Sequence, residues 1–132
     1  MNRMLGLLWI PLAVMVTGAG GFGLCTALGW NPGLMGMTVA GAGSILAGFA
    51  GIVPTLLAGR GSQAEVAQAA LIGTLAHLFV HALLAAVVFL AKPPIGPEFV
   101  YWLLAFYWVS LIVLAVLLAG VVRRSRADIR GN

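Results

Sequence analysis

Two histidines are the residues of this chain best suited to chemistry. His77 and His81 lie four positions apart within a long uncharged apolar stretch. On a helix this spacing places both imidazoles on the same face, about one turn apart. Ionisable side chains in such a stretch are rare and usually functional. The pattern therefore predicts an intramembrane polar pair, with Thr74 continuing the same face.

Three interpretations of this pair remain open. In the first, the histidines are structural and bond across to the next apolar stretch, where Tyr107 and Ser110 fall at matching depths. In the second, they share a metal or another ion, although a closed site needs more ligands than these two. In the third, one of them ligates a haem or a chlorin. We expect the structural pair, with no metal and no cofactor.

The remaining reactive residues do not form a catalytic set. The three acidic residues, Glu65, Glu98 and Asp128, all lie near the ends of apolar stretches, away from the histidines. No serine has an acid and a histidine arranged around it. The glycine-rich runs lack the strand context and the lysine of a phosphate-binding loop. The single Cys25 excludes an internal disulfide. We therefore expect a protein that is not an enzyme.

The composition indicates a membrane protein. Of 132 residues, 62% are hydrophobic and only 8% are charged, whereas soluble domains carry about 25% charged residues. A helix rises about 1.5 Å per residue and a bilayer core is about 30 Å thick, so the length allows about four spans. The sequence predicts an all-α integral membrane protein with four transmembrane helices in two antiparallel hairpins, occupying residues 1–122.

Turn-forming residues divide this domain into its spans. Breakers cluster at residues 29–33, 59–61 and 92–97, the last of which holds three prolines. Ser62 and Glu65 have the spacing of a capping box, which marks the start of the third span. The predicted spans cover about residues 4–28, 34–58, 63–91 and 98–122. Residues 123–132 are predicted to be a frayed, basic cytoplasmic tail.

The basic residues predict the orientation. Six of the seven lie on the side of the termini and of the loop between spans two and three, and only Lys92 lies on the other side. The positive-inside rule then places both termini in the cytoplasm, and we expect a multi-pass protein of the bacterial inner membrane. The tail is expected to contact anionic lipid rather than nucleic acid. Its basic residues are Arg123, Arg124, Arg126 and Arg130.

Most of the 18 glycines fall in the first two spans. The second span has a small residue at every fourth position, which is a helix-packing seam that allows backbones to approach closely. This seam consists of Gly36, Ala40, Ser44 and Gly48. It serves either packing against span one or contact with another protein. Pro11 and Pro54 are predicted to kink their helices, either as tolerated irregularities or as a paired cytoplasmic opening.

The layout of the chain resembles that of ATP synthase protein I, with four spans, internal termini and a basic tail. The closest stretch is residues 40–60, AGAGSILAGFAGIVPTLLAGR. It is similar to the family's second span in its small residues, its aliphatic–Pro step and its basic exit residue. The resemblance implies a role in assembling the ring of c subunits of bacterial rotary ATP synthases. Family members commonly have an acidic and a basic residue in the third span, roughly where this chain has His77 and His81.

We therefore expect a non-enzymatic accessory or assembly protein of a membrane complex, with the ATP synthase c ring as the favoured client. Its expected partners are membrane lipid and glycine-rich helices of other membrane subunits, and nucleic acid is not among them. The main alternative is a small ion or metal carrier that acts as a homo-oligomer around His77 and His81. A further alternative is a supernumerary subunit of a respiratory or photosynthetic complex.

Overall fold

The computed structural model describes the backbone of residues 3–58 and 61–130, and the side chains of residues 7–58 and 61–123. This part of the chain forms four helices and no strand: α1 (Arg3–Ala27), α2 (Leu34–Leu57), α3 (Gln63–Ala91) and α4 (Glu98–Arg130). Each contains a stretch long and apolar enough to cross a membrane. The all-helical, four-span prediction is confirmed, and the ends of the first three helices agree with it to within one residue.

Local turn chemistry explains where the helices begin and end. Gly29 and Gly33 take left-handed φ angles of 70° and 58°, which cost glycine little, and they join α1 to α2 through a short turn. At the start of α3, the Glu65 N–H donates to Ser62 Oγ at 3.3 Å, and the Ser62 N–H donates to the Glu65 carboxylate at 2.7 Å. The predicted capping box is therefore confirmed.

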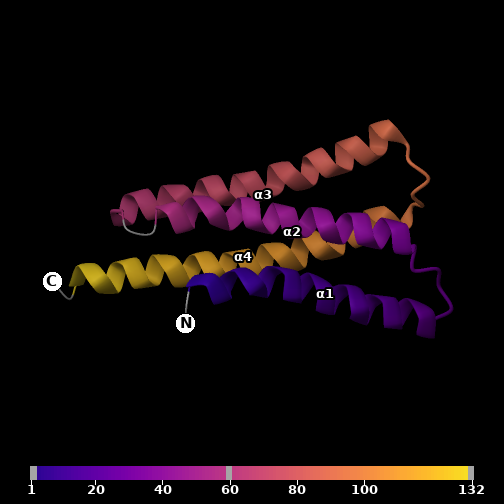
Figure 1. The fold of residues 1–132 in the computed structure, drawn as a ribbon, viewed down its shortest axis with the longest axis horizontal. Coiled ribbons are helices and arrows are strands. Elements are labelled where there is room, and N and C mark those ends of the chain that lie inside the picture. The colour runs from indigo at the N-terminus through magenta and orange to yellow at the C-terminus, as the bar shows by residue number, and fades with distance from the viewer. Residues whose placement is uncertain (1–2, 59–60, 131–132) are drawn as a thin grey trace.

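Helix α2 is the centre of the bundle. It packs more extensively on α3 and α4 than on α1, the helix that precedes it in the sequence. Consecutive helices run in opposite directions, and α1 and α3 lie on opposite sides of α2 and α4 (Figure 1). Helices α1 and α2 contact each other, as do α3 and α4, but both pairs have less extensive contacts than α2 makes with α3 and α4. The pairing into two hairpins stays a prediction.

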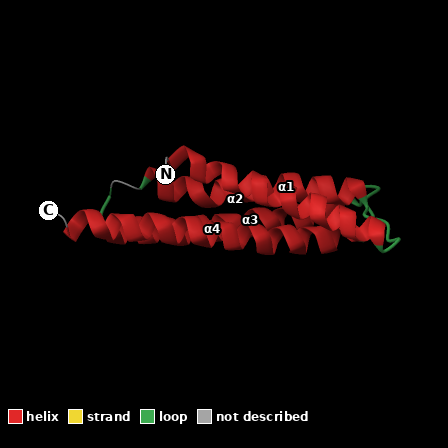
Figure 2. Ribbon diagram, turned by 90° about the horizontal axis from the view of Figure 1, so that it is seen from below, coloured by secondary structure: helices red, strands yellow, loops and turns green. Residues whose placement is uncertain are grey.

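The turns that follow α1 and α3 lie at the same end of the bundle, and the α2–α3 turn lies at the other end with both chain termini (Figure 2). We call the end with the turns after α1 and α3 the two-turn end. It carries residues 28–33 and 92–97. This arrangement is what four consecutive antiparallel spans require.

The core has apolar layers towards both ends. Towards the two-turn end the buried cluster is Val14, Ala40, Phe99, Trp102 and Phe106. Towards the termini it is Ile10, Ile52, Leu114 and Leu118. Two buried serines fall between these clusters: Ser44 on α2 lies between Ala40 and Ile52, and Ser110 on α4 lies between Phe106 and Leu114. The histidines of α3 belong to this middle layer.

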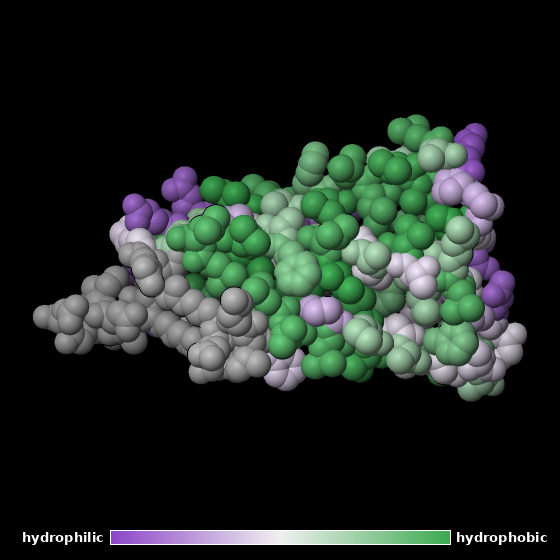
Figure 3. Space-filling view, in the orientation of Figure 1, coloured by the Kyte–Doolittle hydropathy of each residue, from purple (hydrophilic) through white to green (hydrophobic). Residues whose placement is uncertain are grey.

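The outer surface is apolar around the middle of the bundle. Large side chains such as Leu71, Leu75 and Phe79 of α3 are mostly exposed, and the hydrophilic residues gather mainly towards the two ends (Figure 3). Exposed apolar surface on this scale is unusual for a water-soluble protein, whereas the hydrocarbon core of a bilayer solvates it. Together with the four apolar helices, this surface makes the chain a multi-pass membrane protein.

Helix α4 continues farther than predicted. It extends to Arg130, where the sequence pattern predicts a frayed tail. The reason is local, because residues 123–130 contain no glycine or proline and arginine and alanine are good helix formers. Arg123 is exposed. The side chains of Arg124, Arg126 and Arg130 fall outside the described ones, so their contact with lipid stays a prediction.

Candidate functional site: a polar layer across three helices

The two histidines lie on the buried stripe of α3. His77 is 0% exposed and His81 is 5% exposed, and their ring centroids are 4.5 Å apart. The stripe repeats every three or four residues, which turns one face of α3 towards its neighbours. Its members are Val66, Ala69, Gly73, His77 and His81. Its position explains why two imidazoles are buried in a helix that otherwise exposes most of its side chains.

A contact between two glycines brings α3 close enough to α2 for this pairing. A Cβ added to Gly73 would overlap the backbone carbonyl oxygen of Gly51, and a Cβ on Gly51 would lie 3.3 Å from the Cβ of His77. Only glycine at both positions permits this approach. Gly73 was not predicted from the sequence as part of the site; its place four residues before His77, on the same helix face, was the available signal.

His81 connects α3 to α2 through Ser44. Its Nδ1–H donates to the backbone oxygen of His77 at 3.0 Å, so the neutral ring has a lone pair on Nε2. The Ser44 hydroxyl lies 2.9 Å from that nitrogen and donates to it. Both nitrogens of His81 are therefore occupied. Sequence reasoning assigned Ser44 only to packing and did not identify it as a partner of a histidine.

His77 connects α3 to α4 through Ser110. The Ser110 hydroxyl donates to the backbone oxygen of Tyr107 at 3.1 Å, so its oxygen accepts the Nε2–H of His77 at 2.9 Å. This partner is the one that the matching depths in the sequence predict. The Nδ1 atom of His77 then has a lone pair, for which no hydrogen-bond partner lies among the described residues.

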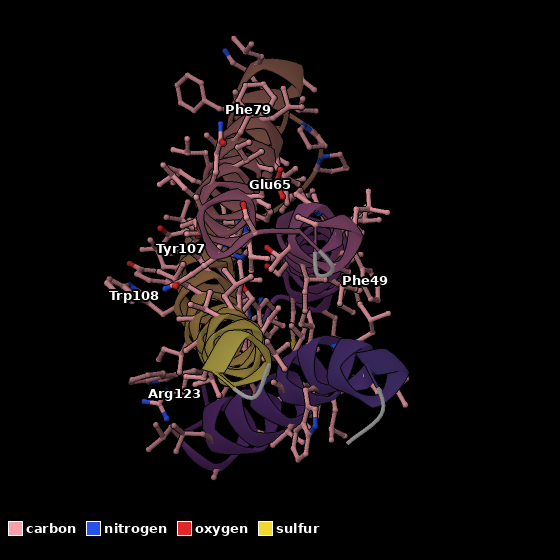
Figure 4. The ribbon with its side chains drawn as sticks, turned by 90° about the vertical axis from the view of Figure 1, so that its left-hand side faces the viewer. Phe49, Glu65, Phe79, Tyr107, Trp108 and Arg123 are labelled. Carbon is pink, nitrogen blue, oxygen red and sulfur yellow. The ribbon has the colours of Figure 1, made fainter. Side chains whose placement is uncertain are left out.

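Tyr107 contributes its ring to the site. It stacks on His77 with centroids 5.6 Å apart at 30°, and it meets the His81 ring edge-on at 5.1 Å and 77°. Tyr107 and Trp108 project to the same side of the bundle from α4 (Figure 4). Thr74, by contrast, donates its hydroxyl hydrogen to the Ala70 carbonyl oxygen of its own helix at 3.0 Å, and no bond joins it to the histidines within the described part.

The packing seam of α2 is used inside the chain. All four of its residues are buried. A Cβ on Gly36 would lie 3.1 Å from backbone atoms of Phe99 on α4, and one on Gly48 would overlap the Ile10 side chain on α1. Ser44 faces α3 through its bond to His81. The seam therefore packs against all three neighbouring helices.

Pro11 and Pro54 both lie inside helices, in α1 and α2 respectively. Thr55, next to Pro54, is fully buried, and its hydroxyl has no hydrogen-bond partner among the described residues. Each proline removes one backbone donor, a loss that membrane helices tolerate where neighbouring helices or side chains re-satisfy the carbonyl. The paired opening that these prolines suggest in the sequence stays a prediction.

The polar layer is best suited to holding helices together. Ser44–His81 and His77–Ser110 join three helices at the centre of the bundle. Within the described residues, no group of three histidine, cysteine, aspartate or glutamate side chains is placed to hold a metal. Of the four imidazole nitrogens, only His77 Nδ1 keeps a lone pair without a partner there.

Comparison with known proteins adds no relative: no family model matches the chain, and neither a curated protein nor a solved structure matches it. The resemblance to ATP synthase protein I therefore rests on the layout of the spans and on residues 40–60. Its implications for function are a proposal.

Proposed function

We propose that this chain is a non-enzymatic accessory or assembly protein that packs against the helices of a larger membrane complex. The favoured client is the ring of c subunits of a bacterial rotary ATP synthase. The observation that supports this proposal most is a face of α1 with small side chains that the chain itself leaves uncovered.

This outward face lies on the half of α1 nearest the two-turn end. Ala19, Gly23 and Ala27 are exposed and follow one another at four-residue steps, with Gly20 beside them. A Cβ on Gly20 or Gly23 would meet no atom within 4 Å. Small residues at such spacing let the backbone of another helix approach closely. Glycine also costs a helix about 1 kcal/mol relative to alanine, so helix propensity alone does not favour it here.

Other exposed surfaces of the bundle have a different character. On α3, the outward positions carry bulky side chains such as Leu75, Phe79 and Leu83, which suit contact with acyl chains. The seam of α2 has small residues, but it is buried inside the chain. The outward face of α1 is therefore the surface on which we place a glycine-rich client helix.

The choice of client rests on the likeness of residues 40–60 to the second span of ATP synthase protein I. The proposed orientation comes from the basic residues and puts the termini and the end of α4 in the cytoplasm of a bacterium, with the four spans in its inner membrane. In that orientation the extension of α4 beyond Arg123 lies beside anionic lipid or a soluble domain of the client.

Co-purification in mild detergent tests the proposal. Tagged wild-type protein and a Gly23→Leu variant are isolated from native membranes, and c subunit is quantified by mass spectrometry. We expect at least ten-fold less c subunit with Gly23→Leu. The matched control is Gly120→Leu on α4, because a Cβ there also meets no atom within 4 Å, and it should recover the wild-type amount.

The outcomes separate the two parts of the proposal. Equal recovery of c subunit by Gly23→Leu and the wild type would remove the α1 face as the docking surface. If c subunit is absent from the wild-type preparation, the client is wrong. Both variants should insert and fold normally, since a Cβ at either position meets no atom within 4 Å.

A second candidate, a small ion or metal carrier, is favoured by the lone pair of His77 Nδ1, which has no partner among the described residues. One nitrogen supplies one ligand, so a carrier would assemble its site from several copies of the chain. Elemental analysis and an absorption spectrum decide between the candidates. A stoichiometric metal or pigment band that His77→Asn abolishes would favour the carrier or a pigment-bearing subunit over the accessory protein.

A further inference from the structure

A pocket of about 600 Å³ lies at the two-turn end, between the turn that follows α1 and the first two turns of α4. This volume falls within the range of small-molecule sites. Glu98 of α4 lines it together with Trp30, Asn31, Tyr101, Trp102 and Ala105. The chain has two other acidic residues, Glu65 and Asp128, and both belong to the opposite end of the bundle.

The pocket follows one face of α4. Glu98 is the first residue of the helix, Tyr101 and Trp102 come three and four positions later, and Ala105 comes seven positions later, so all of them point to the same side. Glu98 therefore lies one helical turn from Tyr101 and Trp102 on the face that lines the pocket. Trp30, in the turn between α1 and α2, supplies a third ring from a different segment.

Trp102 is held rigidly as a wall of this pocket. It is only 8% exposed, and its indole N–H donates to the backbone oxygen of Pro32 at 2.6 Å. Its ring stacks on Phe106, with centroids 5.5 Å apart at 24°. A Cβ on Gly21 would lie 2.6 Å from the far edge of the indole. These three contacts fix the indole before any ligand arrives.

Glu98 is also closely packed against its neighbours. A Cβ on Gly33 would lie 2.8 Å from the Glu98 Cβ, so the start of α4 packs directly on the start of α2. The basic residue of this end, Lys92, borders a different hollow between α3 and α4. Asn31 uses its side-chain oxygen to accept the Gly33 N–H at 3.1 Å. The charge of the pocket is therefore that of one carboxylate.

We propose that this pocket binds an organic ammonium ion, with the cationic nitrogen next to the Glu98 carboxylate and among the rings of Trp30, Tyr101 and Trp102. Aromatic rings attract ammonium groups through their negative faces, and an adjacent carboxylate supplies the counter-charge. A bare divalent cation fits less well, because calcium takes six to eight oxygen ligands. A belt of interfacial aromatic residues accounts for exposed Trp30 and Tyr101, but it does not account for an acid that lines the same pocket.

Calorimetric titration of the full chain in uncharged maltoside micelles tests this site. The probe is phenyltrimethylammonium, and tert-butylbenzene is its neutral isostere. We expect saturable binding of the cation alone, weakened at least ten-fold by Glu98→Gln. Glu65→Gln is the matched control, because it makes the same change in the first turn of α3, at the other end of the bundle, and it should bind like the wild type.

Two results would overturn the proposal: equal affinity of the wild type and Glu98→Gln for the cation, or binding of tert-butylbenzene as tight as that of the cation. Trp30→Leu gives an independent check. The Trp30 side chain is 65% exposed, so its loss should leave the fold intact while weakening binding several-fold. Trp9→Leu, at a half-exposed tryptophan outside the pocket, should not.

The ammonium group has two sources, a free amine or the headgroup of an amine-bearing phospholipid. Nanodiscs of phosphatidylglycerol with an equal fraction of either phosphatidylethanolamine or an amine-free galactolipid distinguish them at constant surface charge. If the lipid headgroup is the occupant, it competes with the probe, and the apparent Kd of the wild type for the probe is higher in the phosphatidylethanolamine discs than in the galactolipid discs. The Glu98→Gln variant should show no such difference. An unchanged Kd identifies a free cation.

Discussion

Replacing Gly73 by alanine should destabilise the bundle. A Cβ at Gly73 would overlap the carbonyl oxygen of Gly51, which is a backbone atom and cannot rotate away. Helices α2 and α3 would have to move apart. Because His81 lies two turns farther along the same stripe of α3, the separation would also lengthen its 2.9 Å contact with Ser44.

The size of the effect follows from three opposing contributions. Forcing an extra methyl group into a packed interface costs about 1–3 kcal/mol. Losing one interhelical hydrogen bond in a membrane costs about 0.6 kcal/mol on average. Alanine returns about 1 kcal/mol, because it favours the helix over glycine. We therefore expect Gly73→Ala to lower the free energy of unfolding by about 0.6–2.6 kcal/mol.

Unfolding in mixed micelles with increasing dodecyl sulfate, followed by far-ultraviolet circular dichroism, measures this difference. Gly20→Ala is the matched control, because it makes the same change inside α1, where a Cβ meets no atom within 4 Å. The control should be neutral or up to about 1 kcal/mol more stable. If both variants unfold at the same dodecyl sulfate fraction, the close approach of α2 and α3 cannot be a major source of stability.

Two further predictions concern the polar layer and the orientation. A double-mutant cycle of Ser44→Ala and His81→Leu should give a coupling energy of about 0.6 kcal/mol, and at most about 1.7 kcal/mol; zero coupling would contradict the 2.9 Å hydrogen bond. In a Cys25→Ser background, a membrane-impermeant thiol reagent should label Asn31→Cys from outside the cell and Asp128→Cys only from the cytoplasm. The reverse labelling pattern would invert the proposed orientation.

The helix boundaries were predictable because local chemistry sets them. Gly29 and Gly33 provide left-handed turns, and Ser62 with Glu65 provides a cap, all of which are visible within a few residues of sequence. The end of α4 was the exception. Charged residues after Val122 predict departure from the membrane, but departure from the membrane does not require the helix to stop, and α4 continues to Arg130.

The pairing of helices was less accessible, because it depends on residues far apart in the chain. The depth of Ser110 predicted its bond to His77 correctly. Ser44, however, is 37 residues from His81, and a serine in a small-residue seam has the same pattern whether it only spaces helices or also donates a hydrogen bond. Gly73 is a single glycine in a long helix, so its importance appears only when Gly51 is placed opposite it.

The glycines of the helices therefore fall into two groups, those that face the inside of the bundle and those that face outward. Gly36, Gly48, Gly51 and Gly73 face inward, and a Cβ on any of them would meet another helix of the same chain. Gly20 and Gly23 face outward and meet nothing within 4 Å. Inward glycines have a structural reason in the folded monomer, namely close packing where lipid supplies no hydrophobic drive. The outward pair lacks that reason, which is why we place the contact with a client helix on α1 and not on the glycine-rich seam of α2.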